Sequence, residues 1–183
     1  IFHGTCSEEE YYDTTKRSLS NKHWFPWLQK NLLAAGMHAH TPEVNEAHTP
    51  TYNKWLTELN RYEINANTTL VGHSYGGGFL LRWVNDNPDK EVDRIVLIAP
   101  WLDPESTKSG DILPLNNLRD SVNAGNIKIF VSDDDMDSIK KSLLIIQEKL
   151  PSADIISCNN YGHFTYSAMQ TEQFPELLEV ITK

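Results

Sequence analysis

The stretch TLVGHSYGGGF, residues 69–79, places a serine between two glycines at the end of an apolar run. Ser74 follows Gly72 and precedes Gly76 in the pattern G-x-S-x-G. Flanking glycines permit a sharp turn from a strand into a helix, and that turn exposes the serine hydroxyl. The pattern alone is weak, but the apolar run before it and the helical segment after it are the setting that a nucleophilic serine requires. We therefore predict that Ser74 is a nucleophile.

The apolar segments around this stretch alternate between strand-like and helix-like patterns. Alternation of this kind predicts right-handed βαβ units and a mostly parallel sheet covered by helices on both faces. We expect a three-layer α/β/α sandwich, formed as a single domain over residues 1–183. The expected strands are 1–2, 37–40, 68–72, 93–100, 127–132 and 153–158, and the expected helices are 24–35, 50–62, 79–85, 115–124, 139–150 and 174–182.

The composition of the chain disfavours several kinds of binding partner. The formal net charge of −9 disfavours nucleic acid and anionic membranes as partners, and no apolar run approaches the length of a membrane span. Cys6 and Cys158 are far apart and in no metal-ligand spacing, so two free thiols in a cytoplasmic protein are the expectation. We expect no cofactor, no metal, and a small molecule as the partner.

Two later strand ends add chemistry that a serine nucleophile needs. Parallel sheets bind ligands at the carboxyl ends of their strands. The run SDDDMD, residues 132–137, follows one expected strand, and His163 follows the last one in YGHF. The aspartate run lacks the glycine and the terminal glutamate of a calcium loop. The order Ser, Asp, His at successive strand ends is that of a hydrolytic triad, with His163 as the base.

Acyl transfer also needs donors for a tetrahedral oxyanion and a surface for the acyl group. The amide that follows the nucleophile, from Tyr75, is the first expected donor. The early loop after strand 1–2 supplies the second, from Thr5, with Cys6 as the alternative. We expect the aromatic side chains of Trp101 and Phe164 to approach the acyl group, because both lie near predicted strand ends.

Motifs spread over nearly the whole chain resemble the short serine hydrolases of the α/β-hydrolase superfamily typified by retinoblastoma-binding protein 9 and its bacterial relatives. The motifs are IFHGT (1–5), HWFPWLQKNL (23–32), LVGHSYGG (70–77), IVLIAPW (95–101), SDDD (132–135) and GHF (162–164). The resemblance implies a minimal hydrolase fold without a large cap domain. The Leu-x-Cys-x-Glu motif for retinoblastoma binding is absent, so that partnership is not expected.

The same resemblance implies which aspartate orients the base. The acid of the family is typically the second of two adjacent aspartates and is followed by proline, which maps to Asp134. Asp135 stands where the proline would be, so Asp133 remains an alternative, and Asp103, one strand earlier, is a third candidate.

The expected activity is hydrolysis of small carboxylic esters by a Ser74–His163–Asp134 triad through an acyl-enzyme intermediate. A thioesterase or an amidase with the same triad is an alternative, because sequence does not separate acyl leaving groups. A non-catalytic pseudo-hydrolase that acts as a binding protein is the alternative outside enzymes.

Overall fold

The computed structural model describes all residues 1–183 and is built around a parallel sheet with the strand order β1–β2–β3–β4. Each strand pairs in parallel with the next one: Val71 lies opposite Val96, Leu97 opposite Ile129, and Ile129 opposite Ile155. Phe2 extends the sheet by an isolated parallel bridge to Gly72. The strands are β1 (Thr69–His73), β2 (Arg94–Ile98), β3 (Ile127–Ser132) and β4 (Asp154–Cys158).

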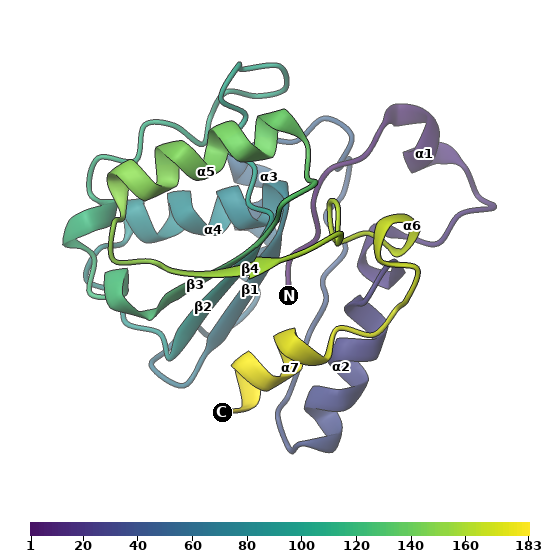
Figure 1. The fold of residues 1–183 in the computed structure, drawn as a ribbon, viewed down its shortest axis with the longest axis horizontal. Helices are drawn as coiled ribbons and strands as arrows, with labels where there is room; N and C mark the ends of the chain where they lie inside the picture. The colour runs from purple at the N-terminus through teal and green to yellow at the C-terminus, as the bar shows by residue number, and fades with distance from the viewer.

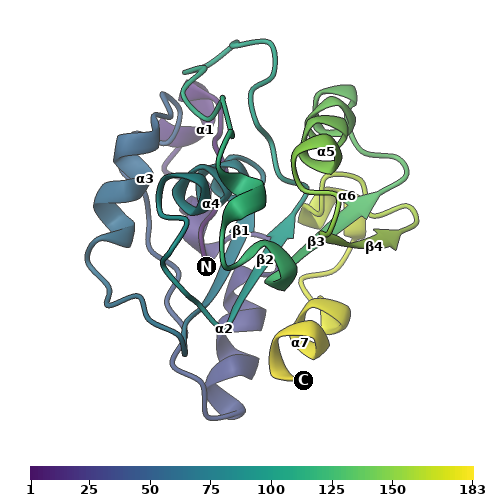
Figure 2. The same cartoon turned by 90° about the vertical axis from the view of Figure 1, so that its left-hand side faces the viewer.

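Helices cover both faces of this sheet (Figures 1 and 2). On one face lie α3 (Tyr52–Leu59), α4 (Tyr75–Asp86) and α5 (Asp137–Lys149), and on the other lie α2 (Phe25–Ala34) and α7 (Pro175–Thr182). The short helices α1 (Glu8–Tyr12) and α6 (Tyr166–Met169) lie near the end of the sheet toward which the strands point. The expected three-layer α/β/α fold without a large cap is therefore confirmed.

The central strands read as continuous apolar runs because both of their faces are buried. In β2, Ile95 and Leu97 pack into the core beneath α3, α4 and α5, whereas Val96 and Ile98 pack into the core beneath α2 and α7. Successive side chains of a strand point to opposite faces, so one apolar run supplies both cores. The rigid sheet that results fixes the positions of the loops at its carboxyl edge.

Two of the expected secondary-structure elements do not form. Residues 115–124 do not form an α-helix but contain the 3₁₀ turn Leu118–Asp120, followed by a second turn at Ala124–Asn126. The side chain of Asn123 holds this path, since it accepts from the Val92 amide at 3.1 Å and donates to the Lys90 carbonyl at 2.7 Å.

The expected strand at 37–40 is also absent. Its carbonyls bind other groups: Gln29 Nε2 donates to the Ala39 carbonyl at 3.0 Å, and the Ile1 amino group donates to the His40 carbonyl at 2.7 Å. None of the helices combines the length and the apolar character that a membrane crossing needs.

Candidate active site

Ser74 is the single residue between β1 and α4, and its backbone is left-handed, with φ 55° and ψ −122°. A positive φ is costly for a serine and persists only where the surroundings impose it. Here the end of β2 imposes it: the Ser74 amide donates to the Ile98 carbonyl at 2.9 Å, and the Ser74 carbonyl accepts from the Trp101 amide at 2.9 Å. The structure thus forms the strand-to-helix turn predicted around Ser74.

The glycines around Ser74 allow backbones to approach closely. A Cβ on Gly72 would lie 2.6 Å from the carbonyl oxygen of Gly76, and one on Gly76 would lie 2.6 Å from the carbonyls of Phe2 and His3. The next two glycines face the segment after β2. A Cβ on Gly77 would lie 3.0 Å from Pro100 Cβ, and one on Gly78 only 2.1 Å from the Trp101 carbonyl oxygen. Helix α4 therefore packs directly on its neighbours.

His163 connects Ser74 to an aspartate. Its Nε2 lies 2.9 Å from Ser74 Oγ, and its Nδ1 lies 3.1 Å from Asp135 Oδ1 and 3.3 Å from Oδ2. Ser74 is 8% exposed and Asp135 is 5% exposed, so the three side chains form a largely buried chain of polar contacts. A carboxylate at Nδ1 favours the tautomer with the proton on that nitrogen, which leaves Nε2 free to accept a proton from the serine.

The prediction that Asp134 contacts His163 is wrong, because Asp135 occupies that place. Asp134 Oδ1 instead accepts from Ser132 Oγ at 2.6 Å and from the Gly162 amide at 2.8 Å. These two hydrogen bonds, that from Ser132 first, lower the pKa of the Asp134 carboxyl. Asp134 therefore shapes the loop that holds His163 without contacting the imidazole.

The other two candidate acids are also used elsewhere. Asp133 Oδ1 accepts from the Asn160 amide at 2.9 Å. Asp103 is buried and accepts from the amides of Thr107, Lys108 and Gly110, so it organises its own loop. The three consecutive aspartates after β3 thus each bind a different group of the 160–163 loop. The first binds the amide of residue 160, the second the amide of residue 162, and the third the imidazole of residue 163.

The imidazole of His73, which precedes Ser74, supports the backbone of His163. His73 Nε2 lies 2.8 Å from the His163 carbonyl oxygen, and the two rings have centroids 4.9 Å apart. Burial holds the pKa of His73 well below its usual value, so the ring is neutral and Nε2 carries the donated proton. A second donor, Trp24 Nε1, binds the adjacent carbonyl of Phe164 at 3.0 Å.

One amide predicted for the oxyanion, that of Tyr75, directly follows Ser74, and the loop of the other, Thr5, lies nearby. Tyr75 is the first residue of α4, so its amide has no acceptor within the helix. The loop that contains Thr5 passes close to the serine, because a Cβ on the adjacent Gly4 would lie 2.7 Å from Ser74 Cβ and 3.2 Å from its Oγ. Thr5 and Ser74 line the same cavity of about 250 Å³.

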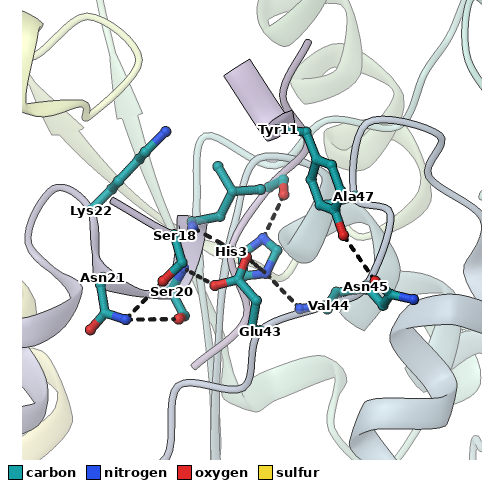
Figure 3. A network of polar contacts seen from close by, with 12 residues as sticks. His3, Tyr11, Ser18, Ser20, Asn21, Lys22, Glu43, Val44, Asn45 and Ala47 are labelled. Carbon is teal, nitrogen blue, oxygen red and sulfur yellow. Dashed lines mark hydrogen bonds and ion pairs between the residues drawn. The ribbon is translucent and has the colours of Figure 1, made fainter. Parts of the chain in front are cut away.

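The side chain of His3 holds this early loop in place (Figure 3). Its Nε2 accepts from the Val44 amide at 2.9 Å, so Nδ1 carries the proton and donates to the Gly4 carbonyl at 2.7 Å. Burial lowers the pKa of His3, which keeps the ring neutral. Thr5 Oγ1 adds a hydrogen bond to the Ala47 carbonyl at 2.5 Å. These contacts tie the loop of residues 3–5 to the 44–47 segment.

The expected acyl-contacting aromatics do not line the cavity that contains Ser74. Phe164 is fully buried, with φ 53°, and its ring stacks on Phe174 at a centroid distance of 5.6 Å, so the prediction for Phe164 is wrong. Trp101 contributes its amide to the turn at Ser74, while its ring packs against the core. Sequence reasoning missed Glu10, His23 and Ser167, which do line this cavity.

Comparisons with known proteins show the family of this chain. A family model described as "Serine hydrolase" matches residues 16–183. The curated protein "Putative hydrolase YdeN" of Bacillus subtilis (strain 168) is 36% identical over 86 residues, an alignment that spans 45% of this chain and 45% of that relative.

Solved structures show the same fold. The ydeN gene product of B. subtilis superposes with a TM-score of 0.75 at 24% identity, over 100% of this chain and 95% of that chain. A putative YdeN-like hydrolase from Pectobacterium atrosepticum gives 0.65 at 15% identity, over 100% and 86%. Est1E from Butyrivibrio proteoclasticus gives 0.61 at 14% identity, over 100% and 87%.

Proposed function

We propose that this chain, which belongs to the serine hydrolase family and is therefore a hydrolase, cleaves small carboxylic esters with Ser74 as nucleophile, His163 as base and Asp135 as orienting acid. The observation that carries the proposal is the pair of contacts of one imidazole, 2.9 Å from Ser74 Oγ and 3.1 Å from Asp135 Oδ1. A serine hydroxyl is a weak nucleophile unless a base takes its proton, and these distances are within hydrogen-bond reach.

In the proposed reaction, Ser74 Oγ attacks the carbonyl carbon of the ester while its proton passes to His163 Nε2. Asp135 stabilises the imidazolium, and the amides of Tyr75 and Thr5 donate to the oxyanion. The C–O bond to the alcohol then breaks, and His163 returns the proton to the leaving oxygen. Water, deprotonated by His163, cleaves the acyl-enzyme, which releases the carboxylic acid and restores Ser74.

A small acyl group fits the cavity around Ser74. The volume of about 250 Å³ is below the range of about 300–1,000 Å³ that is usual for drug-sized ligands, and polar groups dominate its lining. Est1E, which shares the fold, is the subject of a structure with ferulic acid bound, and ferulic acid is a carboxylic acid. The small cavity favours short acyl groups, and the Est1E complex favours esters of carboxylic acids.

Labelling with a fluorophosphonate probe tests the proposal, because the probe reacts with activated serines. We expect the wild-type chain to be labelled and Ser74→Ala to lose both the label and p-nitrophenyl acetate turnover, the latter by about 10⁴-fold or more. Ser152→Ala is the matched control, since Ser152 is exposed and lies before β4.

The outcomes separate the alternatives. An unlabelled wild-type chain with no turnover would favour a pseudo-hydrolase that only binds ligands. Labelling with faster cleavage of acetyl thioesters or anilides than of matched acetate esters would favour a thioesterase or an amidase. A series of esters that favours long acyl chains would contradict the proposed preference for small ones.

A further inference from the structure

A wide polar groove adjoins the cavity that contains Ser74. The groove has a volume of about 1290 Å³, and it shares Glu10, His23 and Ser167 with the smaller cavity. Helix α1 and the residues after it form one side, and α6 with the chain leading to α7 forms another (Figure 1). A substrate bound to Ser74 therefore has room to extend past these three residues into the groove.

The segment that carries His163 continues into the lining of the groove. His163 returns its proton to the alcohol oxygen, so the alcohol half of an ester must lie near that imidazole. Tyr166 and Ser167, which line the groove, follow His163 by three and four residues. The alcohol half, which must approach His163, is therefore the half that we assign to the groove beside this segment.

The charges of the groove are nearly balanced and largely paired. Its acids are Glu9, Glu10, Asp13 and Glu172, and its cations are Lys16, Arg17 and Lys22. Arg17 Nη1 lies 2.6 Å from Glu172 Oε1, and Lys22 forms an ion pair with Glu10. Four acids against three cations leave an excess of a single negative charge, so the groove has little net charge with which to attract a charged ligand.

The remaining chemistry of the groove suits a ligand with many hydroxyl groups. Serine, threonine, glutamine and tyrosine side chains line it and can exchange hydrogen bonds with hydroxyls. Trp27 and the 52% exposed Tyr166 add aromatic rings whose faces can pack on C–H groups.

His23 stands where the cavity and the groove meet. Its Nδ1 accepts a hydrogen bond from the Tyr166 amide at 3.0 Å, so in the neutral ring the proton is on Nε2. Burial, with Lys22 nearby, lowers the pKa of His23 to about 4, and the ring is therefore neutral at physiological pH. Nε2 makes no hydrogen bond within the protein and is not fully buried, so its N–H is free to donate to a ligand.

We propose that the groove binds an uncharged, polyhydroxylated alcohol half of the ester substrate, such as a sugar, and that His23 Nε2–H donates to one of its oxygens. This inference rests on the proposed esterase function and adds the substrate class and a specificity residue. The imidazole of His23 lines both spaces, and its φ of 54° is a backbone conformation that histidine adopts more often than most residues do.

Two acetate esters of matched shape test the proposal. Glucose 6-acetate and cyclohexylmethyl acetate both carry a six-membered ring on a CH₂–O–acetyl group, and only the first bears hydroxyls on that ring. Acetate release gives kcat/KM for each. We expect the wild-type chain to prefer glucose 6-acetate by at least about tenfold, because unpaired polar groups in a binding site penalise the ligand that lacks hydroxyls.

The variant His23→Asn removes the Nε2 donor and keeps a residue type that tolerates a positive φ. We expect the preference for glucose 6-acetate over cyclohexylmethyl acetate to fall about tenfold, as for the loss of one hydrogen bond. Fluorophosphonate labelling of Ser74 in this variant measures separately whether the nucleophile is still activated. His38→Asn is the matched control, because His38 is exposed and lines neither the groove nor the Ser74 cavity.

Each of the other outcomes would contradict a specific part of the proposal. Equal loss on both esters in His23→Asn would make His23 structural. A wild-type chain that is labelled but shows no preference for the glucose ester would refute the groove assignment and leave the esterase proposal standing. A wild-type chain that is neither labelled nor active would refute the esterase proposal itself.

Discussion

His73 Nε2 lies 2.8 Å from the carbonyl oxygen of His163, so the residue before the nucleophile binds the backbone of the base. This contact joins the last residue of β1 to the loop after β4 without using the Ser74–His163 hydrogen bond. A partly buried hydrogen bond to the backbone of the base therefore helps to hold the two reacting side chains near each other.

Replacing His73 should slow catalysis without removing the triad. In His73→Ala the His163 carbonyl loses its donor, and we expect kcat to fall about 10- to 100-fold, the cost of one unsatisfied buried group. His73→Gln can still donate and should recover part of the loss. Steady-state kinetics with p-nitrophenyl acetate checks this, and equal kcat in all three proteins would contradict it.

The two adjacent aspartates should differ sharply in effect. Asp135→Asn leaves an amide at His163 Nδ1 and favours the wrong tautomer, so we expect kcat to fall by about 10³- to 10⁴-fold. Asp134→Asn keeps an oxygen that can accept from the Gly162 amide and should cost far less. The same kinetic assay separates them, and a larger loss in Asp134→Asn would show that the 160–163 loop rearranges in solution.

The third glycine after Tyr75 should not tolerate a side chain. Gly78→Ala gains about 1 kcal/mol of helix propensity but forces a Cβ against the Trp101 carbonyl, and we expect net destabilisation of about 1–3 kcal/mol. Gly77→Val should also destabilise the fold, because its side chain would press against Pro100.

Gly125→Ala is the control for these glycine variants, since a Cβ there meets nothing within 4 Å. Urea denaturation measures all three, and unchanged stability of Gly78→Ala would show that α4 can move away from β2.

Buried neutral histidines should make the protein less stable in weak acid. The pKa values of His3, His23 and His73 are all lowered in the folded state, that of His23 to about 4. Above about pH 6.5 both states are neutral at these sites, whereas below it the unfolded chain binds protons that the folded chain does not. The free energy of unfolding should therefore fall as pH drops, by up to about 1.4 kcal/mol per pH unit for each histidine.

Urea unfolding at pH 7.5, 6.5 and 5.5 tests this pH dependence. His73→Gln should show a shallower decline, because one of the three sites is removed. Stability that stays constant or rises between pH 7.5 and 5.5 would contradict the prediction.

The positions of Ser74 and His163 could be predicted because each follows a strand that its apolar residues mark clearly. The choice among the aspartates could not, since three identical residues differ only by where β3 ends and the turn begins. Ser132 ends the strand and binds Asp134, and this moves the carboxylate that faces His163 one residue further along.

The other site residues that were predicted wrongly or not at all depend on tertiary contacts. Phe164 is adjacent to His163, but its left-handed backbone turns the ring into the core against Phe174. His23 lies at no strand end, so the rule that finds ligands at strand ends does not reach it. The hydrogen bond from Trp24 to the Phe164 carbonyl brings that segment to the site, and nothing local in the sequence signals it.

The left-handed backbone of Ser74 also has an evolutionary consequence. Glycine adopts a φ of 55° without the steric cost that serine bears, so Ser74→Gly should raise the melting temperature while it abolishes turnover. Selection for heat resistance alone would then discard the nucleophile, and only selection for turnover would retain a serine at this position.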